Sequence, residues 1–379
     1  MPTAVPYLLT PGPLTTSATV KAAMQRDWGS RDVEFIAMNR EVRERLLGLV
    51  EAEETHVCVP LQGSGTFTVE AVIGTLLPRA GKLLVLVNGE YGRRIVEIAR
   101  VMGRRVEAVE WPEDEPVDPA EVGRRLSADR SVTHVAVVHC ETTSGILNPI
   151  GAVAEAVAVR GLPLIIDSMS AFGALPLNAR SSPFAAVAAS ANKCLEGVPG
   201  MGFAIIDREV LEASKGNCSS LSLDLYAQWK GFERNGQWRF TPPTHVVAAL
   251  LQALDEHAAE GGVAGRGARY ARNHELLVDG MEALGFECLL ARAVQAPIIV
   301  TFLMPGDPHF EFLDFYERLS ARGFLIYPGK LTVADSFRIG CIGRIGETEI
   351  RSALDAIRAV LDEMGVRDCA PAQVVRPLA

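Results

Sequence analysis

Short apolar runs and helical repeats alternate along the chain from about residue 40 to 210. The stretch EVRERLLGLVEA (41–52) places its apolar side chains three and four residues apart, which predicts a helix with one apolar face. HVCVPLQ (56–62) and KLLVLVNG (82–89) are continuous apolar runs that indicate buried strands. The same two patterns then alternate as helix, strand, helix, strand, helix, strand and strand over 93–102, 105–111, 119–126, 133–143, 150–159, 162–167 and 184–193. This order predicts a largely parallel sheet covered by helices on both faces.

The pattern changes after about residue 265. Strand-like runs occur at 286–290, 296–305, 324–330 and 335–343, and a helix is expected over 309–322. The last helix has apolar residues at three- and four-residue spacing, namely Ile350, Leu354, Ile357, Leu361 and Met364. We therefore expect an α/β fold with three parts: an N-terminal segment over 1–15, a large domain over 16–265 and a smaller α+β domain over 266–379.

Composition and charge narrow the possible functions. The 379 residues carry a net charge of −9, which disfavours nucleic acid as a partner because such a partner needs a basic surface. No apolar run reaches 18 residues, and the N-terminus has no basic and apolar leader pattern, so we expect neither a membrane span nor export. Seven cysteines without a CxxC pair indicate reduced thiols and a cytoplasmic enzyme rather than a disulfide framework or a metal site.

Polar and reactive residues follow the predicted strands. They are Ser64 and Thr66, Tyr91, the run from Glu141 to Thr143, Asp167 and Lys193. Ligands of open parallel sheets bind at the carboxyl ends of the strands, so these residues are candidates for one site.

The turn LQGSGT (61–66) joins a strand to a helix. Free backbone N–H groups and the positive end of a helix dipole suit a phosphate there. The pattern matches neither GxGxxG nor a P-loop, and a purely structural turn would look the same. Ser64, Gly65 and Thr66 are therefore candidates for phosphate binding.

Asp167 and Lys193 end two consecutive predicted strands. A buried carboxylate needs either a local capping role or a cation, and the protonated ring nitrogen of pyridoxal 5'-phosphate is such a cation. A lysine in that place is either a surface charge or an amine held in a dry pocket, where it can act as a nucleophile. Neighbouring strands lie about 5 Å apart, so both side chains can reach one pyridine ring. Together with the glycine-serine turn, the pair favours a pyridoxal phosphate site.

Three further motifs add candidates. Tyr91 in NGEYG can stack on a ring or be half-buried in a loop, and HCETTSG (139–145) offers hydroxyls to a ring oxygen. His139 is expected in the core, because no other metal ligands lie at useful spacing. Arg338 lies inside the apolar strand SFRIGCIG, where it either binds a substrate anion or forms an internal salt bridge.

These motifs, in this order, resemble the class V aminotransferases, which belong to the fold-type I pyridoxal phosphate enzymes. The similar stretches are LLTPGPLTT, LQGSGT, NGEYG, VHCETTSGILNPI, IIDSMSAFG, SANKCLEGVPG, IYPGK and FRIGCIG, which together span about residues 8–345. Within the family, the chain is most similar to the transaminases of 2-aminoethylphosphonate and pyruvate. Asn192 before the lysine matches that group, whereas cysteine desulfurases and kynureninases usually carry His-Lys there.

The resemblance implies a role for each matching residue. Lys193 would bind the cofactor and move the proton, Asp167 would hold the ring nitrogen, Tyr91 would stack on the ring and Thr142 would contact the ring hydroxyl. Ser64, Gly65 and Thr66 would hold the phosphate with Thr241 from the partner of a homodimer, and the N-terminal segment would lie near the site. Arg338 would bind the substrate anion, with Lys330, Arg31 or Arg93 as a second cation for a phosphonate.

The resemblance also implies the reaction, which breaks down a phosphonate. 2-Aminoethylphosphonate and pyruvate would give phosphonoacetaldehyde and L-alanine. Two alternatives remain open: an alanine- or serine-glyoxylate aminotransferase, which would share the lysine, aspartate and phosphate turn, and a pyridoxal phosphate-binding regulator without turnover. Intact Lys193 and Asp167, and the lack of a DNA-binding segment, argue against the regulator.

Overall fold

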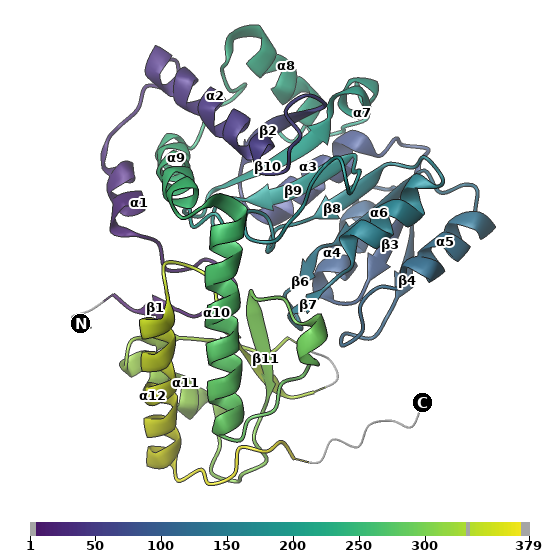
Figure 1. Ribbon diagram of the computed structural model, residues 1–379. Coiled ribbons are helices and arrows are strands. Elements are labelled where there is room, and N and C mark those ends of the chain that lie inside the picture. The colour runs from purple at the N-terminus through teal and green to yellow at the C-terminus, as the bar shows by residue number, and fades with distance from the viewer. Residues whose placement is uncertain (1–4, 331–333, 373–379) are drawn as a thin grey trace.

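A seven-stranded sheet forms the centre of the larger part of the molecule (Figure 1). The computed structural model describes residues 5–330 and 334–372. In spatial order the strands are β2 (His56–Gln62), β10 (Met201–Asp207), β9 (Ala186–Ser190), β8 (Leu164–Asp167), β5 (His134–Val138), β3 (Lys82–Val87) and β4 (Arg105–Glu110). Every pairing is parallel except the two made by β10, so the predicted largely parallel sheet is confirmed. The antiparallel β10 was not predicted.

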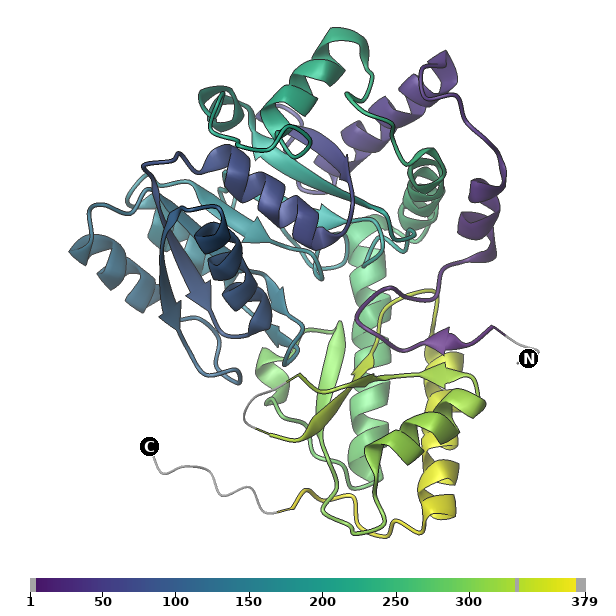
Figure 2. The ribbon, with the colours of Figure 1, turned by 180° about the vertical axis from the view of Figure 1, so that it is seen from behind.

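Helices cover both faces of this sheet (Figures 1 and 2). Successive side chains of a strand point to opposite faces, and β3 shows this clearly: Leu84 and Leu86 join one apolar core, whereas Leu83, Val85 and Val87 join the other. The first core takes side chains from α2 (Val33–Gly48), α5 (Pro119–Ala128), α6 (Ile150–Ala158) and α9 (Thr244–Ala259). The second takes them from α3 (Gly65–Leu76), α4 (Glu90–Val101), α7 (Arg208–Ala213) and α8 (Leu225–Asn235).

Local sequence explains several of these helix ends. Asp118 accepts a hydrogen bond from the backbone N–H of Ala120, and Pro119 occupies the first position of α5. Asp224 caps α8 in the same way, and Gly236 ends that helix in the left-handed conformation. The shorter elements are α1 (Ala18–Ala22), η1 (Ala23–Gln25), β6 (Cys140–Glu141) and β7 (Ile146–Leu147).

The C-terminal part is built on a three-stranded antiparallel sheet, in the order β11 (Ile299–Leu303), β14 (Ser336–Gly340) and β13 (Tyr327–Pro328). α10 (Gly262–Ala283), η2 (Arg292–Val294), α11 (Phe312–Ala321) and α12 (Glu347–Met364) complete it. The N-terminal strand β1 (Tyr7–Leu8) pairs in parallel with β12 (Phe324–Leu325), so the N-terminal segment joins the C-terminal part of the molecule (Figure 2).

Most C-terminal elements match the prediction, with two differences. Residues 286–290 form no regular strand: Cys288 makes an isolated bridge to Phe302, with single backbone bonds on either side of it. α11 begins at Phe312 rather than 309, because the Glu311 carboxylate caps it by accepting from Leu313 and Asp314. The predicted last helix is confirmed as α12, with Ile350, Ile357 and Leu361 buried.

The position of α10 bears on the expected division into domains. α10 follows α9 and continues along the C-terminal part (Figure 1), and residue 265 lies in its first turn. The division into 1–15, 16–265 and 266–379 stays a prediction, and its residues 1–4 and 373–379 lie outside the described residues. Among the helices formed by the described residues, none has the length and apolar content to cross a membrane.

Candidate active site

A cavity of about 550 Å³ lies at the carboxyl ends of the central strands. It is lined by many of the residues expected there: Ser64, Gly65, Thr66, Tyr91, Asp167, Asn192 and Lys193. The register supports the expected proximity of the two charged residues, because Asp167 at the end of β8 is paired with Ala188 of β9, two residues before that strand ends. The parallel sheet therefore brings side chains from four separate stretches of sequence to one wall.

The phosphate candidate is the N-terminus of α3. Ser64 precedes the helix in an extended conformation, and its side chain makes no capping hydrogen bond, so the first N–H groups of the helix are left for another acceptor. A Cβ atom at Gly65 would lie only 2.6 Å from the Met169 sulfur, so a side chain at this position would require Met169 to move. The turn meets the requirements for binding a phosphate.

Lys193 lies three residues beyond β9 and faces the N-terminal segment. Its Nζ donates to the carbonyl oxygens of Pro11, at 2.6 Å, and Gly12, at 3.2 Å. A Cβ at Gly12 would come within 2.5 Å of the lysine Cδ, so the close crossing of the two segments requires glycine there. Burial lowers the pKa of Lys193 to about 8. An amine with that pKa is partly neutral near neutral pH and is therefore nucleophilic.

Asp167 has a buried carboxylate, which a nearby positive charge would stabilise. One oxygen accepts from the backbone N–H of Met169 at 3.0 Å, and burial raises the pKa of the side chain to about 6. Among the described residues, no salt bridge involves Asp167. A protonated ring nitrogen at this point would supply the missing charge.

Glu141 orients Tyr91 and was not assigned that role from the sequence. The Glu141 carboxylate is buried and accepts from the backbone N–H groups of Tyr91, at 3.0 Å, and Gly92, at 3.3 Å. It thus caps α4 from outside the helix and fixes the start of the helix beside the cavity. A glutamate 50 residues away in sequence gives no local signal of this contact.

The structure also changes the choice of a second cation. Arg93 binds Glu90 and Glu113, at 2.9 and 3.0 Å, whereas the neighbouring Arg94 lines the cavity with its guanidinium 4.8 Å from the Tyr91 ring centre. Arg94 was not predicted from the sequence, although its spacing from Tyr91 places both on one helical face. The other two suggested cations, Arg31 and Lys330, are exposed and do not line the cavity.

Arg338 lies in the middle of β14 and is 2% exposed. Its guanidinium donates to the carbonyl oxygen of Thr142 at 2.8 Å and, through two nitrogens, to that of Pro328 at 3.1 Å. Among the described residues, no salt bridge involves Arg338, so the internal salt bridge considered from the sequence is not found. Its charge is close enough to contribute to lowering the pKa of Lys193.

Three expected residues do not line the cavity. Arg338 is one of them, and Thr142, whose carbonyl oxygen accepts from Arg338, is buried outside the lining. Thr241 is exposed and lines a separate groove with Phe67 and Phe240. His139 is buried, as expected, with Nδ1 3.0 Å from the Ser168 hydroxyl, and burial lowers its pKa to about 4. No group of three potential His, Cys, Asp or Glu metal ligands occurs in the described part of the chain.

A family model for class V aminotransferases matches residues 15–329. The chain belongs to this family. This class V aminotransferase is 56% identical over 364 residues to 2-aminoethylphosphonate–pyruvate transaminase 2 of Burkholderia lata, which covers 96% of this chain and 97% of the relative. It is 53% identical over 363 residues to the 2-aminoethylphosphonate–pyruvate transaminase of Pseudomonas putida strain W619, with 96% and 99% covered. The resemblance seen in the motifs is confirmed.

Solved structures show the fold of this class V aminotransferase. Pyridoxamine–pyruvate aminotransferase from Mesorhizobium loti superposes with a TM-score of 0.88 at 24% identity, and ureidoglycine–glyoxylate aminotransferase from Bacillus subtilis with 0.89 at 22%. Each comparison covers 97% of this chain and 95% of the other. The predicted fold-type I architecture is confirmed.

The cofactor of this class V aminotransferase is pyridoxal 5'-phosphate, as expected from the sequence. The cavity fits that molecule at three of its functional groups. The open end of α3 suits the phosphate, Asp167 suits the ring nitrogen and Lys193 suits the aldehyde. The buried Ser190 hydroxyl also lines the cavity and has no partner among the described residues, so it is a further polar group available to a ligand.

Proposed function

We propose that this chain transfers the amino group of 2-aminoethylphosphonate to pyruvate, which yields phosphonoacetaldehyde and L-alanine. Relatives named for this reaction are 52–56% identical over almost the whole chain. Within the site, the observation that carries the proposal is Arg338, a buried guanidinium near Lys193 whose three hydrogen bonds go to backbone carbonyls. Its positive charge is left for a substrate anion, which is a phosphonate in one half-reaction and a carboxylate in the other.

Each residue of the site has its own role in the proposed reaction. Lys193 would hold the cofactor through its Nζ, and the same amine, when free, would move the proton at the substrate carbon. Bound pyridoxal phosphate supplies an electron sink for the substrate carbanion. Asp167 keeps the ring nitrogen protonated and Tyr91 covers the ring. Ser64, Gly65 and Thr66 hold the phosphate with backbone and hydroxyl donors, and Asn192 lies beside the ring. Arg338 orients the substrate, and the carbonyl oxygen of Thr142 positions Arg338.

We further propose a homodimer in the cytoplasm. Thr241 shares its groove with Phe67 and Phe240, which are 52% and 45% exposed. Phe67 is in the first turn of α3, so a partner packed on these rings would place its own Thr241 near the phosphate turn. Apolar exposure of this kind is typical of a protein interface. All seven cysteines are unpaired, which supports a reducing compartment. In this proposal, residues 16–265 bind the cofactor and 266–379 contribute Arg338.

Single half-reactions test the proposed substrate. The purified enzyme with its cofactor is mixed with 2-aminoethylphosphonate, L-alanine or L-serine without a keto acid, and the cofactor absorbance is followed. Rapid loss of absorbance with the phosphonate, at concentrations where serine has little effect, is expected. A response to serine or alanine without one to the phosphonate would instead assign the enzyme to the glyoxylate branch. No response to any amine would leave a cofactor-binding protein without turnover.

A further inference from the structure

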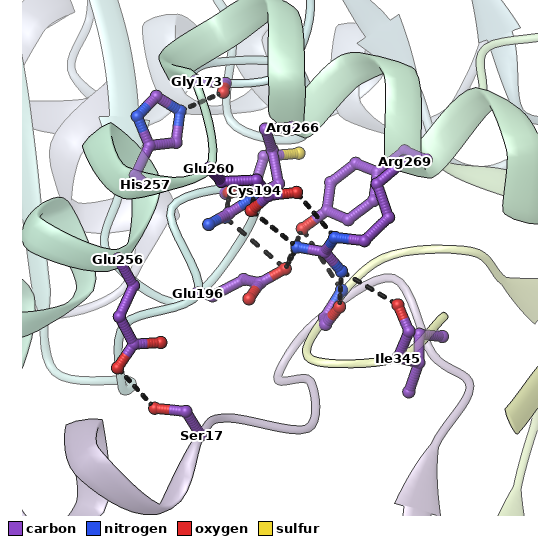
Figure 3. Close-up of polar contacts among 12 residues, drawn as sticks. Ser17, Gly173, Cys194, Glu196, Glu256, His257, Glu260, Arg266, Arg269 and Ile345 are labelled. Atoms are coloured by element: carbon purple, nitrogen blue, oxygen red, sulfur yellow. Dashed lines mark hydrogen bonds and ion pairs between the residues drawn. The ribbon is translucent and has the colours of Figure 1, made fainter. Parts of the chain in front are cut away.

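A cluster of mostly charged side chains surrounds Glu196 (Figure 3), which follows Lys193 by three residues. We call it the Glu196 cluster, and it consists of Glu196, Glu260, Arg266, Arg269 and Tyr270. One oxygen of Glu196 accepts from the Tyr270 hydroxyl at 2.6 Å and from Arg269 at 2.7 Å, and Arg266 lies 3.4 Å from it. Glu196 is 2% exposed and Arg266 is fully buried. Two carboxylates thus face two guanidinium groups, with Glu196 and Arg266 buried and Glu260 and Arg269 partly exposed.

Stability alone does not explain such a cluster. Burying paired charges costs desolvation energy, and apolar residues of similar volume often stabilise a protein as well or better. Two further costs appear at Glu196 itself. Its second carboxylate oxygen is buried without a hydrogen-bond partner among the described residues, and its φ is +61°, in the left-handed region that favours glycine. A glutamate kept in a glycine-like conformation indicates that its side chain is needed there.

On one side, the cluster holds the turn that carries the lysine. The backbone N–H of Glu196 donates to the carbonyl oxygen of Lys193 at 2.8 Å, which closes the turn. Arg266 donates to the carbonyl oxygen of Cys194, between these two residues, at 2.5 Å. Glu196 therefore holds a backbone turn that begins at the lysine, directly through its N–H and indirectly through Arg266 beside its carboxylate.

On the other side, the cluster holds the segment 340–345, which directly follows Arg338 on β14. Arg269 donates to the carbonyl oxygens of Gly343 at 2.5 Å and Ile345 at 2.9 Å, and the Tyr270 hydroxyl accepts from the Gly343 N–H at 3.2 Å. Figure 3 shows Arg269 between Glu196 and Ile345. One guanidinium thus joins the lysine turn to the strand that carries the substrate arginine.

The same segment also anchors the chain that crosses over Lys193. The backbone N–H of Gly340 donates to the carbonyl oxygen of Leu9 at 3.0 Å. The backbone N–H of Arg344 donates to the carbonyl oxygen of Thr15 at 2.7 Å. Between these two points, the carbonyls of Pro11 and Gly12 accept from Lys193. Segment 340–345 therefore holds the lysine backbone through the Glu196 cluster and the lysine amine through residues 9–15.

We propose that Glu196 is a positioning residue for transamination. Through Arg269 it locks the turn after Lys193 to segment 340–345, so that the lysine amine and the Arg338 guanidinium keep one fixed separation and orientation. This role rests on the proposed function, because it concerns the geometry between the proton-transferring amine and the substrate anion. Glu196 touches neither substrate nor cofactor in this proposal.

Two substitutions at one position test the role of the carboxylate. Glu196→Gln keeps the shape and removes the charge, and Glu196→Gly removes the side chain while suiting the positive φ. Glu256→Gln is the matched control. The Glu256 carboxylate also accepts a partly buried hydrogen bond, from the Ser17 hydroxyl at 2.7 Å, but it lies outside the Glu196 cluster. Borohydride reduction followed by mass spectrometry counts the sites with cofactor attached to Lys193, and single-turnover rates with each substrate are divided by that count.

Both Glu196 variants are expected to lose about tenfold or more in rate per attached cofactor, because small errors in the placement of reacting groups are costly. Glu256→Gln should match the unsubstituted enzyme. A purely structural role would lower the number of attached sites and leave the rate per site unchanged. An unchanged rate per site in either Glu196 variant, or an equal loss in Glu256→Gln, would overturn the proposal.

Arg269→Lys provides a second route if the Glu196 variants do not fold. It keeps the positive charge but loses the fork that joins Glu196 to segment 340–345. The rate per attached cofactor should again fall, and an unchanged rate in this folded variant would refute the coupling. If the enzyme responds to serine or alanine and not to the phosphonate, the proposed substrate fails, and the same comparison run with the active amine still tests Glu196.

Discussion

The large parallel sheet and the small antiparallel sheet contribute to the site in different ways. The large sheet gathers its residues at one edge, because the carboxyl ends of its parallel strands lie together, and Asp167 and Lys193 follow neighbouring strands. The small sheet contributes Arg338 from the middle of a strand, held by carbonyl oxygens of Thr142 and Pro328. We infer that the first region handles the cofactor and the second recognises the substrate anion, so substitutions should separate the two tasks.

Lys193→Ala should produce the largest effect, because it removes the amine through which the large sheet holds the cofactor. Loss of the proton-transferring amine alone is expected to cost about 10²–10⁴-fold in rate, and borohydride should trap no cofactor. Lys215→Ala, at an exposed lysine, is the control.

The pH dependence of attachment tests the environment of the same amine. Since burial lowers the pKa of Lys193 to about 8, the neutral amine accumulates as the pH rises, and the attachment rate should increase up to about pH 8 and then level off. An inflection near the ordinary lysine value of 10.5 would contradict a buried amine.

Asp167→Asn should show the next largest effect, on stability without cofactor. Burial raises the pKa of this carboxyl from 3.8 to about 6, so the cofactor-free protein should lose stability as the pH rises from about 4 to about 6 and remain less stable above that. At about 1.4 kcal/mol per pK unit, the asparagine variant gains up to about 3 kcal/mol at pH 8 and almost nothing at pH 4. Denaturant unfolding at the two pH values measures the difference, while catalysis by the loaded variant should fall.

An unchanged free energy of unfolding in Asp167→Asn would mean that the large sheet does not hold the cofactor through this carboxylate. If Asp167→Asn has the same free energy of unfolding as the unsubstituted protein at both pH values, the carboxylate is already compensated without cofactor. In that case Asp167 acts as a local cap for Met169, the alternative left open by the sequence.

Arg338→Lys should give the smallest of the three effects and the most selective one. A lysine keeps the charge but cannot match the planar fork, so KM for both 2-aminoethylphosphonate and pyruvate should rise about tenfold, the loss of one charged hydrogen bond. Attachment of the cofactor to Lys193 should be unchanged. Arg344→Lys, at an exposed arginine six residues later, is the control. Weaker cofactor attachment together with the raised KM would show that the two regions do not act separately.

The accuracy of the sequence-based predictions also differs between regions. On the large sheet, strand-end residues were predicted to line one site, because apolar runs mark strands and the helices between them imply parallel neighbours. Arg94 and Arg93 show what the sequence does not predict, namely which of two neighbouring side chains faces the cavity. Both follow Tyr91 on α4, and packing turned Arg94 toward the cavity and left Arg93 with Glu90 and Glu113.

The role proposed for Glu196 is still harder to predict from the sequence. Its partners come from residues 260–270, and its effect reaches 343–345, so every contact depends on packing between distant segments. No periodicity or turn pattern marks it, and its positive φ contradicts the preference of its residue type. Likewise, antiparallel β10 and the pairing of β1 with β12 were not evident in the local sequence.

The sequence by itself determined most helices and strands of the parallel sheet, the residues at the strand ends and the family, because these depend on local periodicity and on short motifs. Only the tertiary structure decided which of those residues share a cavity, how far burial moves the pKa values of Lys193 and Asp167, and how Glu196 joins two distant segments. The physical reason is that desolvation and long-range hydrogen bonds depend on what surrounds a side chain in space, which the neighbouring residues in sequence do not specify.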